Sequence, residues 1–586
     1  MNKDSAGDQF WLAIGLISVT FHVYLIFSGL TPSLISRPLH LLAALPWIFL
    51  VTRASFLQSV RDIVWFCVAS FACFYLVICE SELSDQYGFL QGYIQYFIAF
   101  ILILTVLEMA RRTVGLPLPT VTALFLLYGF FGDLIPGEFG HGGIPLGSLL
   151  GTLIITEGGL WGPLTGVSVS IISIFLIFGA ILNAGEAGRG FMNLAVASAG
   201  NLKGGAAKVS VISSALFGPI SGSASANVAS TGMVTLPTMQ RLGYPKRVAA
   251  AVEAVASTGG QIMPPLMGAG AFIMVELTGV PYTEVILAAS LPALLYFSPV
   301  WIGVNRYADL FDLKPVAASD QPKKTELLIT VAFFLVPFAV LLWLMFGGYT
   351  PQYAAALAAI AAACLLFVGS DSKLDIIRGF NRLSQAIAVS GRQISMIASI
   401  ILCASLIVGV LGITGLGVKI TSLILSVSGD SLYLTLALTA VACLFLGMEV
   451  PTTAAYVICV SVAGPALIDR GLDPLLVHLF VFWYALLSTI TPPVCGGVFI
   501  AAGMIEENWL KVAISAMAIG VGLYIIPIGM VTHPEIITLD NLLYALLFSI
   551  KIAAGITVSS YGLISRRKLV ERLALVIVGL VILFVR

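Results

Sequence analysis

Long apolar segments recur along the whole of this chain. Runs such as 11–29 and 327–346 contain few charged residues and reach the length of about 18–22 residues that a helix needs to cross a bilayer. Because lipid cannot satisfy backbone polar groups, crossings must be helices or strands of a closed barrel. Barrel strands need only about 9–11 residues, so the runs are too long for them. The sequence predicts an all-α integral membrane protein.

Composition excludes several classes of function. Only 10% of the residues are charged, against roughly 25% in soluble proteins, and the formal net charge is zero, which gives no electrostatic case for nucleic-acid binding. The chain contains no GxxxxGK[ST] phosphate loop and neither of the hydrolase motifs HExxH and GxSxG. We therefore expect neither an ATP-driven pump nor an enzyme, and no cofactor.

The apolar runs predict about 15 crossings, and basic residues sort by side along them. Arg61, Arg111 and Arg112 fall on one face, whereas Glu80 and Asp133 fall on the other. By the positive-inside rule the basic face is cytoplasmic, which places the N-terminus inside the cell. The expected crossings are 10–29, 39–53, 62–79, 94–110, 118–136, 163–184, 245–278, 282–305, 326–346, 351–368, 389–411, 474–504, 510–530, 541–561 and 568–585.

An internal duplication organises the chain. Four matched features are spaced by nearly the same distance, which chance does not readily produce. They are GEAGRGFMNL at 185–194 with GITGLGVKIT at 412–421 (227 apart), Gly218 with Gly447 (229), Pro245 with Pro474 (229), and Pro265 with Pro493 (228). The repeat units span about 94–308 and 326–535, joined by a polar linker at 309–325. The first unit holds five expected crossings, and an odd number inverts the second copy, as in secondary transporters.

Each unit contains a stretch that cannot cross as one helix. In the first, 203–240 reaches the polar sequence GPISGSASANVAST, which predicts a re-entrant hairpin with its tip near 221–227. In the second, 415–470 has its tip at GMEVPTTAAY, 447–456. The first hairpin is expected to enter from the cytoplasmic side and the second from outside. Such backbone is tolerated at membrane depth only where it is buried or lines a cavity.

The first hairpin tip is rich in hydroxyl and amide groups. Gly222 lets the backbone bend, so that carbonyls can face a cation and amides an anion. The alternative is that these small residues only permit close helix packing. For any single serine, packing and binding are equally good explanations, but for the whole cluster a binding site is the better one. The candidate residues are Ser221, Gly222, Ser223, Ser225, Asn227 and Thr231.

Two matched motifs, STGGQIMPP and STITPP, are predicted to break helices in mid-membrane. Prolines remove amide donors and free the carbonyls of the preceding turn, and these carbonyls with threonine hydroxyls suit a hard cation such as sodium. The N-termini of half-helices, positive by their dipole, suit a carboxylate. A simple proline kink explains one such break but not two at matched positions. The candidates are Ser257, Thr258, Gly259, Gly260, Pro264 and Pro265, and Ser488, Thr489, Thr491, Pro492 and Pro493. The candidate sodium ligands are Ser221, Ser223, Asn227, Ser257, Thr258, Thr489 and Thr491.

Acids inside a membrane are rare and costly, so each is a functional candidate. Glu449, at the second hairpin tip with Pro451, Thr452 and Thr453, could carry a proton or face a cation. Glu253 lies one turn before the first helix break, and a purely structural role bonded to nearby backbone is an equal alternative. Glu276 and Arg392 are expected nearer the ends of their crossings, where long side chains can snorkel.

The stretch from GPISGS at 218 to GAGAF at 272, with MEVPTTAAY and STITPPVCGG, resembles the TRAP transporter permeases, and most closely the fused permeases of the TAXI subclass. The resemblance covers roughly 115–530. It implies that 1–113 corresponds to the small membrane subunit, 114–535 to the large one, and 536–586 to extra helices. By position, ion and substrate contacts would fall on 221–227, 257–260, 449–453 and 488–491.

The resemblance also implies a mechanism. It indicates a bacterial or archaeal inner-membrane uptake system supplied by a soluble TAXI-type substrate-binding protein, with an elevator movement driven by sodium or protons. The expected substrates are organic acids such as 2-oxoglutarate, glutamate or a related dicarboxylate. The chain departs from the family at Asn227, where sodium-coupled dicarboxylate members have an acid, and at Glu449, where many TAXI relatives have a small residue; Glu449 favours a proton contribution.

Two other hypotheses make different predictions. A stand-alone ion-coupled carrier of the same architecture would transport without any soluble partner. A membrane hydrolase would lose activity on substitution of a single nucleophilic serine and would not transport.

Overall fold

The computed structural model describes residues 5–51, 56–317, 320–369, 373–448, 450–565 and 567–584. Within these residues the chain is helical, without named strands, and ten helical segments are long and apolar enough to cross a membrane. Shorter apolar helices, among them one half of each broken helix (Gly268–Thr278 and Pro474–Leu487), lie in further predicted crossings. The prediction of an all-α membrane protein is confirmed.

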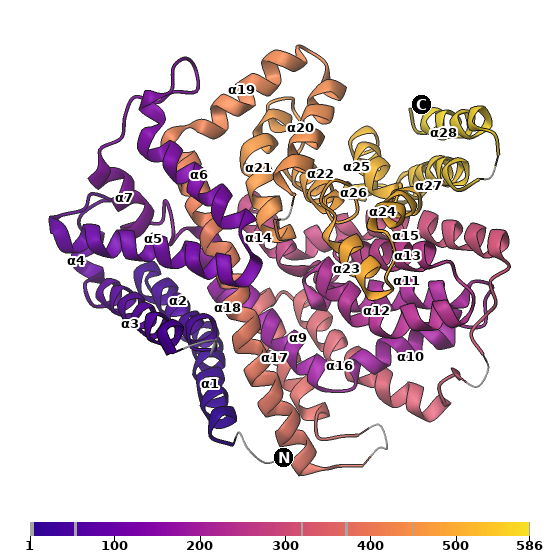
Figure 1. Cartoon of the computed structure of the whole chain (residues 1–586), viewed down its shortest axis with the longest axis horizontal. Helices are drawn as coiled ribbons and strands as arrows, with labels where there is room; N and C mark the ends of the chain where they lie inside the picture. Colours follow the sequence, from indigo (N-terminus) through magenta and orange to yellow (C-terminus); the bar gives the residue numbers. More distant parts are fainter. Residues whose placement is uncertain are drawn as a thin grey trace.

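The N-terminal helices form one side of the molecule, next to the long helix α18 (Ile376–Thr414) (Figure 1). Helices α1, α2 and α5 all pack on α18. A hydrogen-bonded chain of His22, His40 and Ser168 links α1, α2 and η2, a contact that the sequence did not suggest. The helices of this side are α1 (Ser5–Phe27), α2 (Ser33–Phe49), α3 (Phe56–Ile78), α4 (Glu80–Ser84) and α5 (Gly92–Val114).

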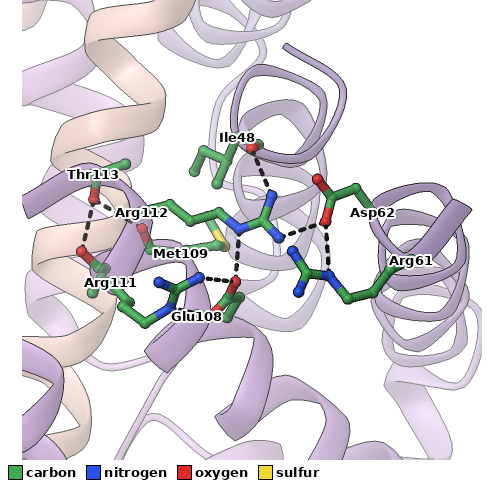
Figure 2. Close-up of polar contacts among 9 residues, drawn as sticks. Ile48, Arg61, Asp62, Glu108, Met109, Arg111, Arg112 and Thr113 are labelled. Carbon is green, nitrogen blue, oxygen red and sulfur yellow. Dashed lines mark hydrogen bonds and ion pairs between the residues drawn. The ribbon is translucent and has the colours of Figure 1, made fainter. Parts of the chain in front are cut away.

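The basic residues predicted on one face meet where α2, α3 and α5 come together. Figure 2 shows Arg112 between Asp62 and Glu108, with ion pairs of 2.6 and 2.7 Å. Arg61 and Arg111 each pair with one of the same two carboxylates. The two acids therefore allow the arginines to lie close together.

The first repeat unit follows. Gly115 (φ 85°) ends α5 in a conformation that favours glycine, and Pro117 begins the next helix. The elements are α6 (Pro117–Phe131), η1 (Gly132–Leu134), α7 (Leu146–Ile155), α8 (Pro163–Val167), the π-helical η2 (Ser168–Ile172), α9 (Ser173–Ala184), α10 (Ala187–Ala199), α11 (Gly205–Ser221), α12 (Ala224–Arg241), α13 (Lys246–Gly260), α14 (Gly268–Thr278) and α15 (Tyr282–Phe311).

The second unit and the C-terminal helices complete the chain. Helix α27 packs on α15 and pairs with α28. The elements are α16 (Lys324–Phe346), α17 (Pro351–Leu365), α18, α19 (Leu416–Ser428), α20 (Leu432–Leu446), α21 (Thr452–Ile468), α22 (Pro474–Leu487), α23 (Gly496–Met504), α24 (Trp509–Ile519), α25 (Gly522–Thr532), α26 (Glu535–Thr538), α27 (Leu542–Ile564) and α28 (Leu569–Phe584).

The helix boundaries repeat at the spacing found in the sequence. Helices α12, α13 and α14 begin at 224, 246 and 268, and α21, α22 and α23 begin at 452, 474 and 496, each 228 residues later. Both predicted helix breaks are present, between α13 and α14 and between α22 and α23. The two units also interlock, because α13 packs on α23, and α14 packs on both α21 and α22.

Four sequence predictions need correction. Helix α18 begins at Ile376 rather than 389, because Asp375 caps it by accepting a hydrogen bond from the amide of Arg378. The region 415–470 is not all hairpin: α19 is a separate helix, and only α20 and α21 form the hairpin. The matching helix α10, and α7, were not predicted. The linker begins later than 309, since α15 continues to Phe311.

Candidate functional site

The first hairpin turns at a single glycine. Helix α11 ends at Ser221, Gly222 adopts φ 67°, and Ser223 caps α12 by accepting a hydrogen bond from the amide of Ala226. A left-handed residue here favours glycine, which explains the SGS sequence. The predicted tip is confirmed, but it is narrower than 221–227, because Asn227 already lies within α12.

The tips of both hairpins line one central cavity of about 310 Å³. The N-terminal ends of two long helices reach it: that of α12, at Ser223, and that of α21, at Pro451 and Thr452. Gln393 of α18 and Phe272 of α14 also line it. None of the described lining residues is charged. The predicted site residues that line this cavity are Ser221, Gly222, Ser223, Pro451, Thr452 and Thr453.

Two hydrogen bonds join the repeat units beside this cavity. The hydroxyl of Thr452 donates to Oε1 of Gln261 over 3.0 Å, which ties the second hairpin tip to the first helix break. The hydroxyls of Thr258 and Thr489 lie 2.8 Å apart, which ties the two breaks together. Residues matched by the duplication therefore meet in space.

A buried polar cluster lies behind the first hairpin tip, where α11, α12 and α13 pack together. Its acid, Glu253, is completely buried and contacts hydroxyls from all three helices. Contrary to the structural alternative considered above, its described hydrogen bonds run to side chains and not to backbone. We call this the Glu253 cluster, and its members are Ser210, Ser214, Asn227, Thr231, Thr235, Glu253 and Ser257.

Asn227 fixes the approach of α11 to α13. Its Nδ2 donates to the carbonyl oxygens of Ser214 (3.1 Å) and Ser257 (3.3 Å), whereas its buried Oδ1 has no hydrogen-bond partner among the described residues. The two helices touch through glycines: a Cβ built on Gly218 would lie 2.4 Å from Cα of Gly260. The glycines of STGGQ thus permit close packing.

The remaining predicted residues lie outside the central cavity. The hydroxyl of Thr491 is 2.6 Å from that of Tyr524, and Ser488 donates to the carbonyl of Ala485. Gly259 packs against the ring of Tyr296. Prolines 264–265 and 492–493 occupy the two breaks, each pair joined by a cis peptide bond, and Ser225 is half-buried on α12. Glu449 lies outside the described residues.

The candidate sodium ligands fall into separate hydrogen-bonded groups. Ser221 bonds to Gly218 and Ser223 at the tip, Asn227 and Ser257 belong to the Glu253 cluster, and Thr258 pairs with Thr489. No group of three or more His, Cys, Asp or Glu side chains suited to a metal occurs in the part of the chain that the structure describes. A sodium site made of oxygens from these residues stays a prediction.

Several site residues were missed by sequence reasoning. Gln261 belongs to the STGGQ motif, so it could have been included among the candidates from the sequence. Ser210, Ser214 and Thr235 carry no local signal, because they reach Glu253 only through the packing of three helices. Gln393 lies on α18, outside both hairpins.

A second cavity, of about 690 Å³, adjoins the central one. Both are lined by Gln393 and Met396 of α18. Arg61, Arg111 and Arg392 line the second cavity, on the face where the sequence places the basic residues. Arg392 lies within α18, which begins before the expected crossing 389–411, and its place near the end of that crossing stays a prediction.

Comparisons with known proteins relate the chain to membrane permeases. Residues 101–542 match the family described as the tripartite ATP-independent periplasmic transporter, DctM component. The chain is 27% identical to the C4-dicarboxylate TRAP transporter large permease protein DctM of Pseudomonas aeruginosa, over 57% of this chain and 76% of that one. It is 25% identical to the isethionate TRAP transporter permease protein DctMQ of Oleidesulfovibrio alaskensis, over 70% of this chain and 67% of that one. The YdaH transporter of Alcanivorax borkumensis aligns with a TM-score of 0.45 and 15% identity, over 75% of this chain and 99% of that one.

The family match covers nearly all of both repeat units and both hairpins, and the apolar helices agree with a multi-pass membrane protein. The chain belongs to the DctM family of TRAP transporter large permeases.

Proposed function

We propose that this permease takes up an organic acid, 2-oxoglutarate, glutamate or a related dicarboxylate, across the inner membrane with its N-terminus in the cytoplasm. A soluble binding protein of the TAXI type delivers the substrate, and a sodium or proton gradient drives an elevator movement. Residues 1–113 serve as a fused small subunit, since α1, α2 and α5 pack along α18.

One observation supports the choice of an organic acid: two helix N-termini, from different repeat units, converge on one cavity whose described lining residues are uncharged. The first N–H groups of a helix have no partner inside it, and the macrodipole adds about half a positive charge there. A carboxylate satisfies both, and two such ends match two carboxylates.

The neighbouring cavity and the relatives support the same class of substrate. The second cavity is lined by four arginines and one acid, Asp62, so its lining has a net positive charge that favours the passage of anions on the basic face. The two relatives compared above are named for C4-dicarboxylate and isethionate, both organic anions.

The test is uptake of labelled 2-oxoglutarate into proteoliposomes that contain the full chain. Uptake is measured with and without the cognate binding protein, under separate sodium and proton gradients. We expect accumulation only with the binding protein, and the effective gradient names the coupling ion. Uptake without the binding protein would instead indicate a stand-alone carrier. No uptake of any compound in a panel of organic acids would refute the proposal.

A further inference from the structure

The carboxyl group of Glu253 is in contact with four hydroxyl groups. Its Oε2 accepts a 2.7 Å hydrogen bond from Ser210 and contacts Oγ1 of Thr235, and its Oε1 contacts Oγ1 of Thr231. Ser257 Oγ lies 3.4 Å from Oε1. Three helices of the first repeat therefore meet at this one acid.

No cation balances this carboxyl among the described residues. The charged or titratable side chains nearest the middle of the packed helices are directed elsewhere: Lys208 of α11 lies over Trp301, and Tyr296 of α15 donates to the carbonyl of Val255. Arg241 of α12 and Lys511 of α24 stand at helix ends, and α23 has no titratable residue. An ionised carboxylate buried without a partner charge costs several kcal/mol, so this acid needs a reason to be present.

The threonine hydroxyls around Glu253 suit two protonation states. Oγ1 of Thr231 lies 2.8 Å from the carbonyl oxygen of Asn227, and Oγ1 of Thr235 lies 3.0 Å from that of Thr231. Each hydroxyl has a single proton to donate. When Glu253 is ionised, the hydroxyls donate to it; when it is protonated, it donates to a hydroxyl, which then donates to the backbone carbonyl. In both states the carboxyl oxygens and the threonine hydroxyls stay hydrogen-bonded. When the hydroxyls donate to Glu253, the backbone carbonyl keeps only its hydrogen bond within the helix.

A cavity leads to this cluster from one side. It has a volume of about 220 Å³ and is lined by Thr235, Arg241 and Asn193, among others. Further toward the N-terminus of α12, Asn227 follows Ala226, which lines the central cavity. Its fully buried Oδ1, which has no hydrogen-bond partner among the described residues, adds an acceptor to the cluster. Along α12, Thr231, which contacts Glu253, thus lies between Ala226 at the central cavity and Thr235 at the smaller cavity.

We propose that Glu253 is a proton-binding site of this transporter, loaded from one cavity and emptied into the other by way of Thr231 and Thr235. Hydronium gives its proton to Oε1 or Oε2, leaving water and a neutral carboxylic acid, and the reverse step restores the carboxylate. The inference rests on the proposed transport of an organic acid, and it assigns the coupling ion to a residue.

The test compares wild-type protein with Glu253→Gln, which keeps the size and neutrality of the protonated acid. In proteoliposomes with a trapped pH indicator and the binding protein present, we expect the variant to lose proton-driven accumulation of 2-oxoglutarate at least tenfold, and to lose the accompanying internal acidification. Exchange of labelled for unlabelled 2-oxoglutarate, which needs no net proton movement, should stay within about twofold. Accumulation and acidification equal to wild type would overturn the proposal.

A second measurement does not depend on transport or on the substrate. Infrared difference spectra of wild-type protein between low and high pH should contain the band of a buried carboxylic acid. Thr235→Val, which removes one hydrogen-bond donor, should shift that band. Thr122→Val, which removes a buried hydroxyl of α6 that donates to the carbonyl of Leu118, should not. A wild-type spectrum without such a band, or one unmoved by Thr235→Val, would refute the assignment. If the band behaves as expected but 2-oxoglutarate is not transported, the substrate proposal fails and the proton site stands.

Discussion

Replacing Gly260 with alanine tests whether the close approach of α11 and α13 holds the site together. The new Cβ would lie 2.4 Å from the carbonyl oxygen of Ser214, 2.8 Å from Cα of Gly218 and 2.8 Å from Nδ2 of Asn227. Carbon atoms in contact lie about 3.5–4.0 Å apart, so the helices must separate by roughly 1 Å. Two of the three obstructing atoms belong to the backbone, so no side-chain rotation relieves the clash.

The expected penalty follows from that geometry. Overpacking a core position costs typically about 1–3 kcal/mol, and we expect the upper end here. A separation of this size also breaks the bonds of Asn227 to the Ser214 and Ser257 carbonyls, which are already 3.1 and 3.3 Å long. We therefore expect a lower melting temperature in detergent and an initial uptake rate reduced at least tenfold.

The matched control is Gly188→Ala, also within a helix. A Cβ at Gly188 would have no atom within 4 Å, so this change should leave the melting temperature and uptake unaltered or slightly improved. If Gly260→Ala behaved like Gly188→Ala in both assays, the argument from close helix packing would be wrong.

Two further substitutions test contacts described above. Thr258→Val and Thr489→Val each remove one hydroxyl of the pair that joins the repeats, and each should lower the stability by about 0.5–1.5 kcal/mol. In thermal unfolding, the double variant should lose less stability than the sum of the two single losses. Losses that add in full would mean that the two hydroxyls do not interact. Asp62→Asn removes the charge that pairs with Arg112 and should cost about 1–3 kcal/mol, seen as a lower melting temperature. Asp540→Asn, at an exposed acid, should change nothing, and an equal effect of both would contradict the role given to the cluster in Figure 2.

The parts of the fold that the sequence predicted correctly depend on local chemistry. Proline pairs at 264–265 and 492–493 cannot continue a helix, so both breaks were readable, and the glycine at 222 marked the hairpin turn. Because the chain is duplicated, the proline break and the hairpin were each indicated twice, once in each repeat unit. These features can be predicted without knowing which distant residues are in contact.

The rest depends on packing between residues far apart in the chain. Ser210 and Glu253 are 43 residues apart and meet only because α11 and α13 touch through glycines. The short helices α10 and α19 were missed because they are not long enough to span a bilayer, so a search for apolar runs passes over them. The N-terminus of α18 was misplaced because its first three turns hold polar and charged residues.

The charge balance between the proposed substrate and the central cavity gives a physical reason for ion coupling. Two helix N-termini supply together about one positive charge, and the described lining residues add none. The proposed dicarboxylate brings two negative charges, so about one is left without a partner in a medium that disfavours it. A cation bound in the same transport step removes that excess. A proton on Glu253 has the same effect, because it removes a negative charge from the cluster that contains Asn227, the residue next to Ala226 of the cavity lining. The coupling of substrate to cation would then follow from the electrostatics of one site rather than from any direct contact between the two.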